Sequence, residues 1–160
     1  MSSTKKASVD KLLSTLASEF NSVEKNIIYQ GNDGCYYLFK KYTIQKDKTG
    51  FLVMRTSTRI GIFYSLKNAF GWCIADKYGK HDLAHSFKNI DWRTENARVS
   101  IHHMKHLAGK TLDSFRHAVL NDRIDFEEKR LSSLQYASDK NISDAKYIQT
   151  RGFLNETSRI

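Results

Sequence analysis

The sequence predicts an α+β protein with a three-stranded antiparallel sheet, one covering helix and a long antiparallel helical hairpin, preceded by an N-terminal helix. Three observations predict this class. Residues 35–64 are dense in aromatic and β-branched residues, broken by short turn sequences, which is typical of a strand meander. Residues 81–126 carry apolar residues at steps of three, four or seven, the spacing of one helix face. Proline is absent, so it interrupts no long helix.

The expected organisation has three parts, and 160 residues with 40% hydrophobic composition suit one domain of ordinary size. Residues 1–30 form a polar tail and a helix, residues 31–80 a β-β-β-α unit, and residues 81–160 a helical hairpin with a short C-terminal helix. No apolar run is long enough for a membrane span, and the start of the chain lacks the apolar stretch of a signal peptide. We therefore expect a protein that is neither secreted nor embedded in a membrane.

The N-terminal helix is expected to begin at Ser8, which can cap it, and to end near Asn26, before the turn sequence of residues 31–34. Its apolar residues follow helical spacing. They are Val9, Leu12, Leu13, Leu16, Ala17, Phe20 and Val23.

The three strands are expected in CYYLFKKYTI, FLVMRT and IGIFY, separated by turns at residues 47–50 and 57–59. The covering helix is SLKNAFGWCIADKYG, with Ser65 as its N-cap and Gly79 as its C-terminal stop. One stripe should face the sheet, and Trp72 lies off that stripe. The stripe contains Leu66, Ala69, Phe70, Cys73 and Ile74. Cys73 and the distant Cys35 both lie among apolar residues, so we expect reduced thiols.

The hairpin is predicted from two apolar stripes on either side of Gly109-Lys110-Thr111, where one helix should end and Thr111 should cap the next. Each helix would be about 40 Å long. The first stripe holds Leu83, Phe87, Ile90, Ala97, Ile101, Met104 and Ala108, and the second holds Leu112, Phe115, Val119 and Phe126. Residues 139–153 should add a short third helix, with Ala145, Ile148 and Phe153 facing inward.

The strongest functional pattern is positive charge in the β-β-β-α unit. Residues 35–80 hold nine Lys or Arg against Asp47 and Asp76, so they carry +7 of the formal net charge of +9. Basic and aromatic residues interleaved on a sheet favour nucleic-acid binding by phosphate contact and base stacking. The alternative is that the aromatic residues are core and the lysines are solvated. The candidate contact residues are Lys40, Lys41, Lys46, Lys48, Arg55, Arg59, Lys67, Tyr37 and Tyr42.

Three patterns that suggest catalysis or metal binding are weaker. His102 and His106 have the spacing of a zinc pair, but the simpler interpretation is a solvated polar helix face. Gly109-Lys110-Thr111 has the ending of a phosphate-binding loop, yet Met104 replaces the first glycine of that motif and no strand precedes it. His81, Asp82, Asn89 and Asn96 suggest a small metal-dependent nuclease, but the helical pattern there opposes a ββα metal site. We expect no cofactor and no enzymatic activity.

Three stretches resemble, in combination, a group of small proteins of marine T4-like bacteriophages of the cyanophage and pelagiphage type. They are YYLFKKYTI, FYSLKNAFGWCIADKYG and AKYIQTRGF, and the resemblance spans roughly residues 30–153. The group carries a helix of the form SLKNAxxWCIxDK and a terminal KYxQTxxF. The matching residues here are Ser65, Leu66, Lys67, Asn68, Ala69, Trp72, Cys73, Ile74, Asp76 and Lys77, then Lys146, Tyr147, Gln149, Thr150 and Phe153. The resemblance implies a phage origin and a fold, and it implies no mechanism.

These observations together favour a non-enzymatic, phage-encoded interaction protein that contacts nucleic acid through its basic, aromatic-rich sheet unit. The second hypothesis is a virion structural or assembly component whose hairpin docks onto a phage or host protein. A small metal-dependent nuclease is the third. We expect the protein in the host cytoplasm during infection, or in the virion.

Overall fold

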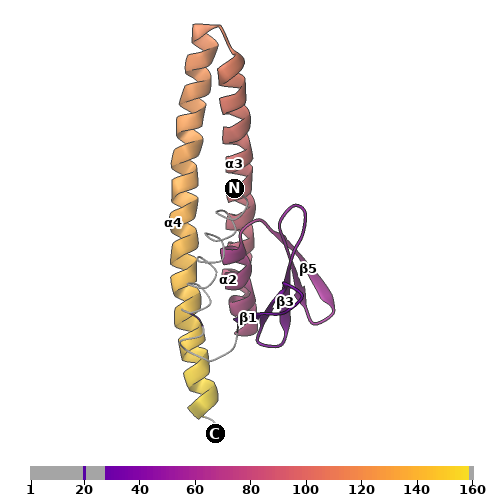
Figure 1. The fold of residues 1–160 in the computed structure, drawn as a ribbon. Helices are drawn as coiled ribbons and strands as arrows, with labels where there is room; N and C mark the ends of the chain where they lie inside the picture. Colours follow the sequence, from indigo (N-terminus) through magenta and orange to yellow (C-terminus); the bar gives the residue numbers. More distant parts are fainter. Residues whose placement is uncertain (1–19, 21–27, 159–160) are drawn as a thin grey trace.

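The computed structural model describes residue 20 and residues 28–158, with side chains described as far as Gly152. Five strands and three helices follow one another along this part of the chain (Figure 1). The strands are β1 (Ile28–Gln30), β2 (Tyr36–Leu38), β3 (Tyr42–Lys46), β4 (Phe51–Arg55) and β5 (Thr58–Phe63). The helices are α2 (Leu66–Lys77), α3 (His81–Lys110) and α4 (Ser114–Ser158). The α+β class and the helical hairpin are confirmed.

The sheet is an antiparallel meander in the order β1-β2-β3-β4-β5, so the prediction of three strands is wrong. The stretch predicted as one strand is a hairpin, because Phe39 and Lys40 form a two-residue turn with φ values of 57° and 59°. Such turns usually contain Asn-Gly, since positive φ is costly for other residues. The short strand β1 adds the fifth member, and β5 begins at Thr58, inside the predicted turn.

One face of the sheet is buried against α2, through Leu38, Tyr42, Ile44, Val53 and Phe63. Helix α2 is capped by Ser65, whose hydroxyl accepts from the backbone N–H of Asn68, as predicted. Gly79 follows the helix with φ of +71°, which confirms it as the stop. Nine of the twelve residues of α2 are buried, Asn68 among them, so this helix is covered on most sides and not only along one stripe.

The side of α2 away from the sheet packs on α3 and α4, which makes three layers of sheet, single helix and hairpin (Figure 1). The approach of α2 to α3 is close, because a Cβ atom at Gly71 would lie 2.3 Å from ring atoms of Phe87. Trp72 packs edge-on against Tyr42, with ring centroids 6.2 Å apart. The core therefore joins the sheet unit to the hairpin through α2.

The predicted stripe on α3 is buried, with Phe87 against α2 and with Ile101, Met104 and Ala108 against Ile124 of α4. Its members recur with the alternating steps of four and three that are typical of a coiled coil. The bend comes slightly later than predicted. Gly109 and Lys110 still belong to α3, and Asp113, not Thr111, caps α4 by accepting from the backbone N–H of Phe115 at 2.9 Å.

Helix α4 differs most from the prediction. It is one continuous helix of 45 residues, so the predicted separate helix at 139–153 is its C-terminal part. The stripe predicted to face α3 is exposed, with Leu112 at 102%, Phe115 at 76% and Phe126 at 68%. A second stripe faces inward instead, and it contains Leu120, Ile124, Leu131, Leu134, Ser138, Ile142 and Ala145. Ala145 is buried and Ile148 half-buried, as expected, whereas the side chain of Phe153 lies outside the described residues.

The predicted N-terminal helix also lies outside the described residues, except for Phe20, which is helical and fully buried. The side-chain amide of Gln149 on α4 donates to the carbonyl of Phe20 at 2.9 Å. Within the described part of the chain, none of the helices combines the length and apolar content that crossing a membrane requires.

The turn between β4 and β5 gives a first prediction. Thr56 has φ of 57° and Ser57 does not share this geometry, so Thr56→Gly should relieve strain, since a β-branched residue is disfavoured there. We expect a gain of about 1 kcal/mol in the free energy of unfolding, measured by chemical denaturation. The control Ser57→Gly should give no gain, because it only adds freedom to the unfolded chain. Equal effects of the two substitutions would contradict this assignment.

A second prediction concerns the buried carboxylate of Asp91, which is 3% exposed. It accepts from the backbone N–H groups of Tyr64 and Ser65, at 2.7 and 2.9 Å, and from the side-chain amide of Asn68 at 3.2 Å. Asp91→Asn would place an amide donor against one of these donors, so we expect a loss of about 2 kcal/mol in the free energy of unfolding. Asp82→Asn on the exposed face of the same helix is the control, and it should change stability little.

Candidate nucleic-acid interface

The nine candidate contact residues do not form one surface. Antiparallel strands alternate in direction, so the turns at 39–41 and 56–57 lie at one end of the sheet. The backbone N–H of Thr56 donates to the carbonyl of Lys41 at 2.7 Å, which confirms that these two turns are neighbours. Lys46 and Lys48 belong to the turn between β3 and β4, at the opposite end.

Three of the candidates are bound to carboxylates of α2 or α4. Tyr42 is 1% exposed and its hydroxyl donates to Asp76 at 2.5 Å, so its ring is not available for stacking. Burial, followed by this hydrogen bond, raises the pKa of Tyr42 well above its usual value. Lys67 makes an ion pair with Asp139 of α4. Arg55 makes an ion pair with Asp76 at 3.0 Å, and the Arg55 side chain remains 38% exposed.

Five basic residues lie at the end of the sheet that carries the turns at 39–41 and 56–57, whereas Lys46 and Lys48 lie at the other end. We call Lys40, Lys41, Arg55, Arg59 and Lys77 the basic end. Lys77 comes from the last turn of α2, and its ammonium lies 5.8 Å from the centroid of the Phe39 ring. Phe39 also packs edge-on against Tyr78, with centroids 6.0 Å apart. The turn thus packs Phe39 against the end of α2 and places Lys77 next to the turn that carries Lys40 and Lys41.

The only carboxylate described within the basic end is that of Asp76, and it is already occupied. Its side chain is 7% exposed, and it accepts from Arg55 and Tyr42. Lys40, Lys41 and Arg59 are exposed, and no ion pair involves them within the described part of the chain. Their charges therefore remain available for an anionic ligand.

Tyr37 lies on the outer face of the sheet, away from α2. It stacks on Tyr29, with ring centroids 5.3 Å apart and an angle of 17° between the planes. The strand register places Tyr29, Tyr37, Thr43, Met54 and Arg59 in one row across this face. The Tyr37 hydroxyl donates to Asp33, and this bond raises the pKa of Tyr37 to about 12. The outer face thus offers flat aromatic surface in the same row as Arg59.

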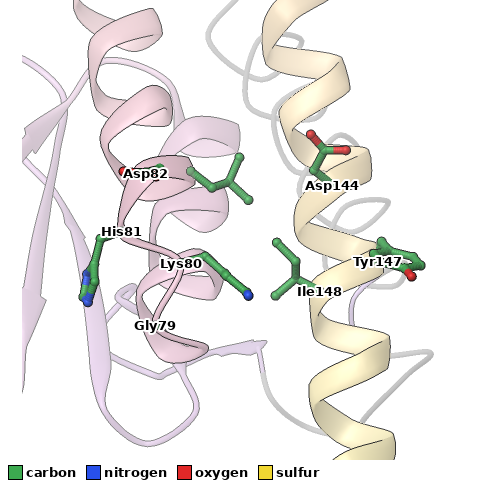
Figure 2. A pocket seen from close by; sticks show the side chains of 8 residues that line it. Gly79, Lys80, His81, Asp82, Asp144, Tyr147 and Ile148 are labelled. Carbon is green, nitrogen blue, oxygen red and sulfur yellow. The ribbon is translucent and has the colours of Figure 1, made fainter.

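A pocket of about 520 Å³ lies elsewhere, between the start of α3 and the last turns of α4. Figure 2 shows the Lys80 side chain pointing into this gap toward Ile148, while the His81 ring points away from α4. The pocket is lined by Gly79, Lys80, His81, Asp82, Leu83, Asp144, Tyr147 and Ile148. A smaller pocket of about 330 Å³ lies beside β5. Its lining residues are Ile62, Tyr64, His85, Lys88, Asn89, Asp91 and Trp92.

The residues considered for a nuclease or a metal site all lie on α3. His81 and Asn96 are fifteen residues apart on one helix, or about 22 Å along its axis, which is too far for both to bind one ion. His102 and His106 are both exposed. Among the residues that the structure describes, no group of three or more His, Cys, Asp or Glu side chains is placed to hold a metal ion.

Sequence reasoning missed Lys77 and Phe39 as parts of the basic end. Lys77 was visible in the last turn of the predicted helix, but the end of the sheet that receives it depends on the turn at Phe39 and Lys40. That turn contains no glycine, asparagine or proline to reveal it. Comparisons of the chain with protein-family models, curated proteins and solved structures find no match. The chain's own geometry therefore has to carry any inference about function.

Proposed function

We propose that this is a non-enzymatic, phage-encoded interaction protein that contacts nucleic acid through the basic end of its sheet. The observation that carries the proposal is that three exposed cations, Lys40, Lys41 and Arg59, gather at one end of the sheet and make no ion pair within the described residues, next to the Arg55–Asp76 ion pair. Phosphate groups of a nucleic-acid backbone are the natural counter-charge for such a surface. The phage origin rests on the sequence resemblance.

The outer face of the sheet adds a second contribution to this proposal. Bases stack on exposed aromatic rings with little sequence preference, and each stacked base contributes about 1–3 kcal/mol. Tyr29 is 48% exposed, and its ring and that of Tyr37 are parallel. A single strand whose phosphates lie on the basic end can therefore place bases along the row that ends at Arg59.

The third prediction tests this interface by charge reversal. Lys40→Glu combined with Lys41→Glu should weaken binding of a fluorescent single-stranded or duplex oligonucleotide at least about tenfold, since each lost phosphate contact removes favourable charge. The matched control is Lys46→Glu with Lys48→Glu, which reverses the same charge at the opposite end of the sheet. Fluorescence anisotropy at low salt provides the measurement.

The dependence of oligonucleotide affinity on salt concentration, measured for the wild-type protein, tests the same interface. About four phosphate contacts should lower affinity by roughly 100-fold between 50 and 200 mM salt. Equal losses in the two double variants would assign binding to overall charge and not to the basic end. The absence of measurable binding at low salt would end the proposal.

A specific observation also favours the second candidate, a virion structural or assembly component that docks through the hairpin. The hairpin projects well past the sheet unit (Figure 1), and its tip carries Leu112 at 102% exposure and Phe115 at 76%. Apolar side chains at the free end of a rigid projection suit insertion into a groove of another protein.

The fourth prediction concerns this docking. Intact phage particles should retain the wild-type protein through purification, whereas Leu112→Glu should be lost from them, because a charge at a fully exposed tip opposes burial there. Val99→Glu, which changes an exposed apolar residue further down α3, is the control and should stay with the particles. Wild-type protein absent from washed particles would count against the docking role.

A further inference from the structure

The outward face of α4 carries a second apolar stripe, which stays exposed although the guanidinium of Arg151 lies over the ring of Tyr147. Its apolar members are Phe115, Val119, Phe126, Tyr136 and Tyr147, and each of the four aromatic side chains is at least 62% exposed. These positions are spaced by steps of three, four or their sums, so they share one side of the helix. That side is opposite to the stripe that packs on α3, and the sheet unit lies beyond α3 (Figure 1).

The polar positions of this stripe show which partner it fits. They are Asp122, Lys129, Ser133, Lys140 and Ser143, and all are exposed. The stripe is symmetric about the level of Leu131 along the helix. Each of its positions has a counterpart the same number of residues away on the other side of Leu131. Phe126 corresponds to Tyr136, and Asp122 corresponds to Lys140. A helix with this symmetry complements a second copy of itself in the antiparallel direction.

We infer that α4 pairs with α4 of a second copy of this chain in an antiparallel coiled coil with a two-fold axis at Leu131. In this register Phe115 faces Tyr147 of the partner chain, Val119 faces Ser143, and Phe126 faces Tyr136. In every pair of facing residues, an a position of one helix lies opposite a d position of the other, as antiparallel coiled coils require. An interface of this kind presents the same patch from both copies.

Other registers fit less well. Parallel pairing would place Asp122 against Asp122 and Lys140 against Lys140. Sliding the antiparallel pair by one heptad in one direction sets Phe115 against Lys140, and sliding it in the other sets Lys129 against Lys140. Like charges that face each other across an interface cost free energy, as does an aromatic ring against an ammonium that must be desolvated. Only the register centred on Leu131 joins Asp122 to Lys140.

The flanks of the stripe are mixed. Arg130 meets Arg130 of the partner copy at the two-fold axis, and each of the two is paired with Glu127 of its own chain at 3.8 Å. Arg116 lies on the side where Asp144 of the partner copy arrives, which is favourable. Asp125 arrives near Asp139 of the partner copy, but the charge of Asp139 is already met by Lys67 of its own chain. The stripe itself therefore sets the alignment.

The available area is sufficient for a stable dimer. An aromatic side chain buries about 150–250 Å², so four rings that are each about two-thirds exposed offer on the order of 500 Å² per chain. The intervening side chains bring this toward the roughly 800 Å² per partner of a standard interface. The contact extends from Phe115 to Tyr147, or about 48 Å of helix.

The fifth prediction uses the full-length chain and measures its mass in solution by size exclusion with light scattering, over low to high micromolar concentrations. The wild type should be a dimer. Phe126→Glu should raise the dissociation constant of the dimer about 100-fold or more, because it places a charge in two central layers. Val99→Glu changes an apolar residue on α3 that is also exposed, at 58%, and should leave the dimer intact.

A charge swap tests the register itself. Asp122→Lys should weaken the dimer about tenfold or more by facing Lys140, and Lys140→Asp should do the same by facing Asp122. The double variant Asp122→Lys with Lys140→Asp should restore the wild-type mass. Both positions are exposed in the single chain, so circular dichroism should show unchanged folding.

Three results would overturn the inference. A wild-type protein that stays monomeric at every concentration would show that this stripe does not bind a second copy of the chain. A dimer that survives Phe126→Glu would place the interface elsewhere. A dimer weakened by both single charge changes but not restored by the double one would exclude the register centred on Leu131.

Discussion

The fold depends on one buried hydrogen-bond network around the carboxylate of Asp91 on α3. This carboxylate accepts from the backbone at Tyr64 and Ser65, where β5 gives way to α2, and from the side chain of Asn68. Asn68 in turn accepts from the hydroxyl of Ser138 on α4, at 2.7 Å. Burial raises the pKa of Asp91, so its charge carries a desolvation cost that these donors offset. The network therefore fixes the junction between β5 and α2 and the position of α3 and α4 relative to it.

Helix α2 shows how this constraint reaches the basic end. The network holds the start of the helix, and close packing at Gly71 and at Gly152, where a Cβ atom would meet Phe87 or Tyr78 at 2.3 Å, leaves the helix little freedom to turn or slide. Its last turn must then project at the end of the sheet that carries the turn at Phe39 and Lys40. Asp76 and Lys77 arrive there as a consequence, so the electrostatics of that surface follow from the packing of the core.

Sequence patterns were reliable where one residue determines the outcome. Ser65 and Gly79 bound α2 because a hydroxyl cap and a positive φ depend only on local chemistry. The stripe on α3 was also predicted correctly, since that helix has one dominant apolar face. The turn at Phe39 and Lys40 was not predictable, because its backbone geometry is imposed by the packing of Phe39 on Tyr42 and Tyr78 and not by its residue types. Because that turn was not predicted, Lys77 was not recognised as part of the candidate interface.

The error on α4 has a different cause, and it shows how the hairpin can act. Two apolar stripes of the same period lie on opposite sides of this helix, so periodicity alone cannot decide which one faces α3. The inner stripe is the less aromatic one, as close packing of two helices favours. The outer stripe retains the large rings, including Phe115 near the tip. Pairing of α4 with a second copy would cover Phe115 with Tyr147, leaving Leu112 as the apolar residue free at the tip. Docking of the hairpin through Phe115 and self-association through α4 therefore compete for one side chain, and a dimer could dock only through Leu112.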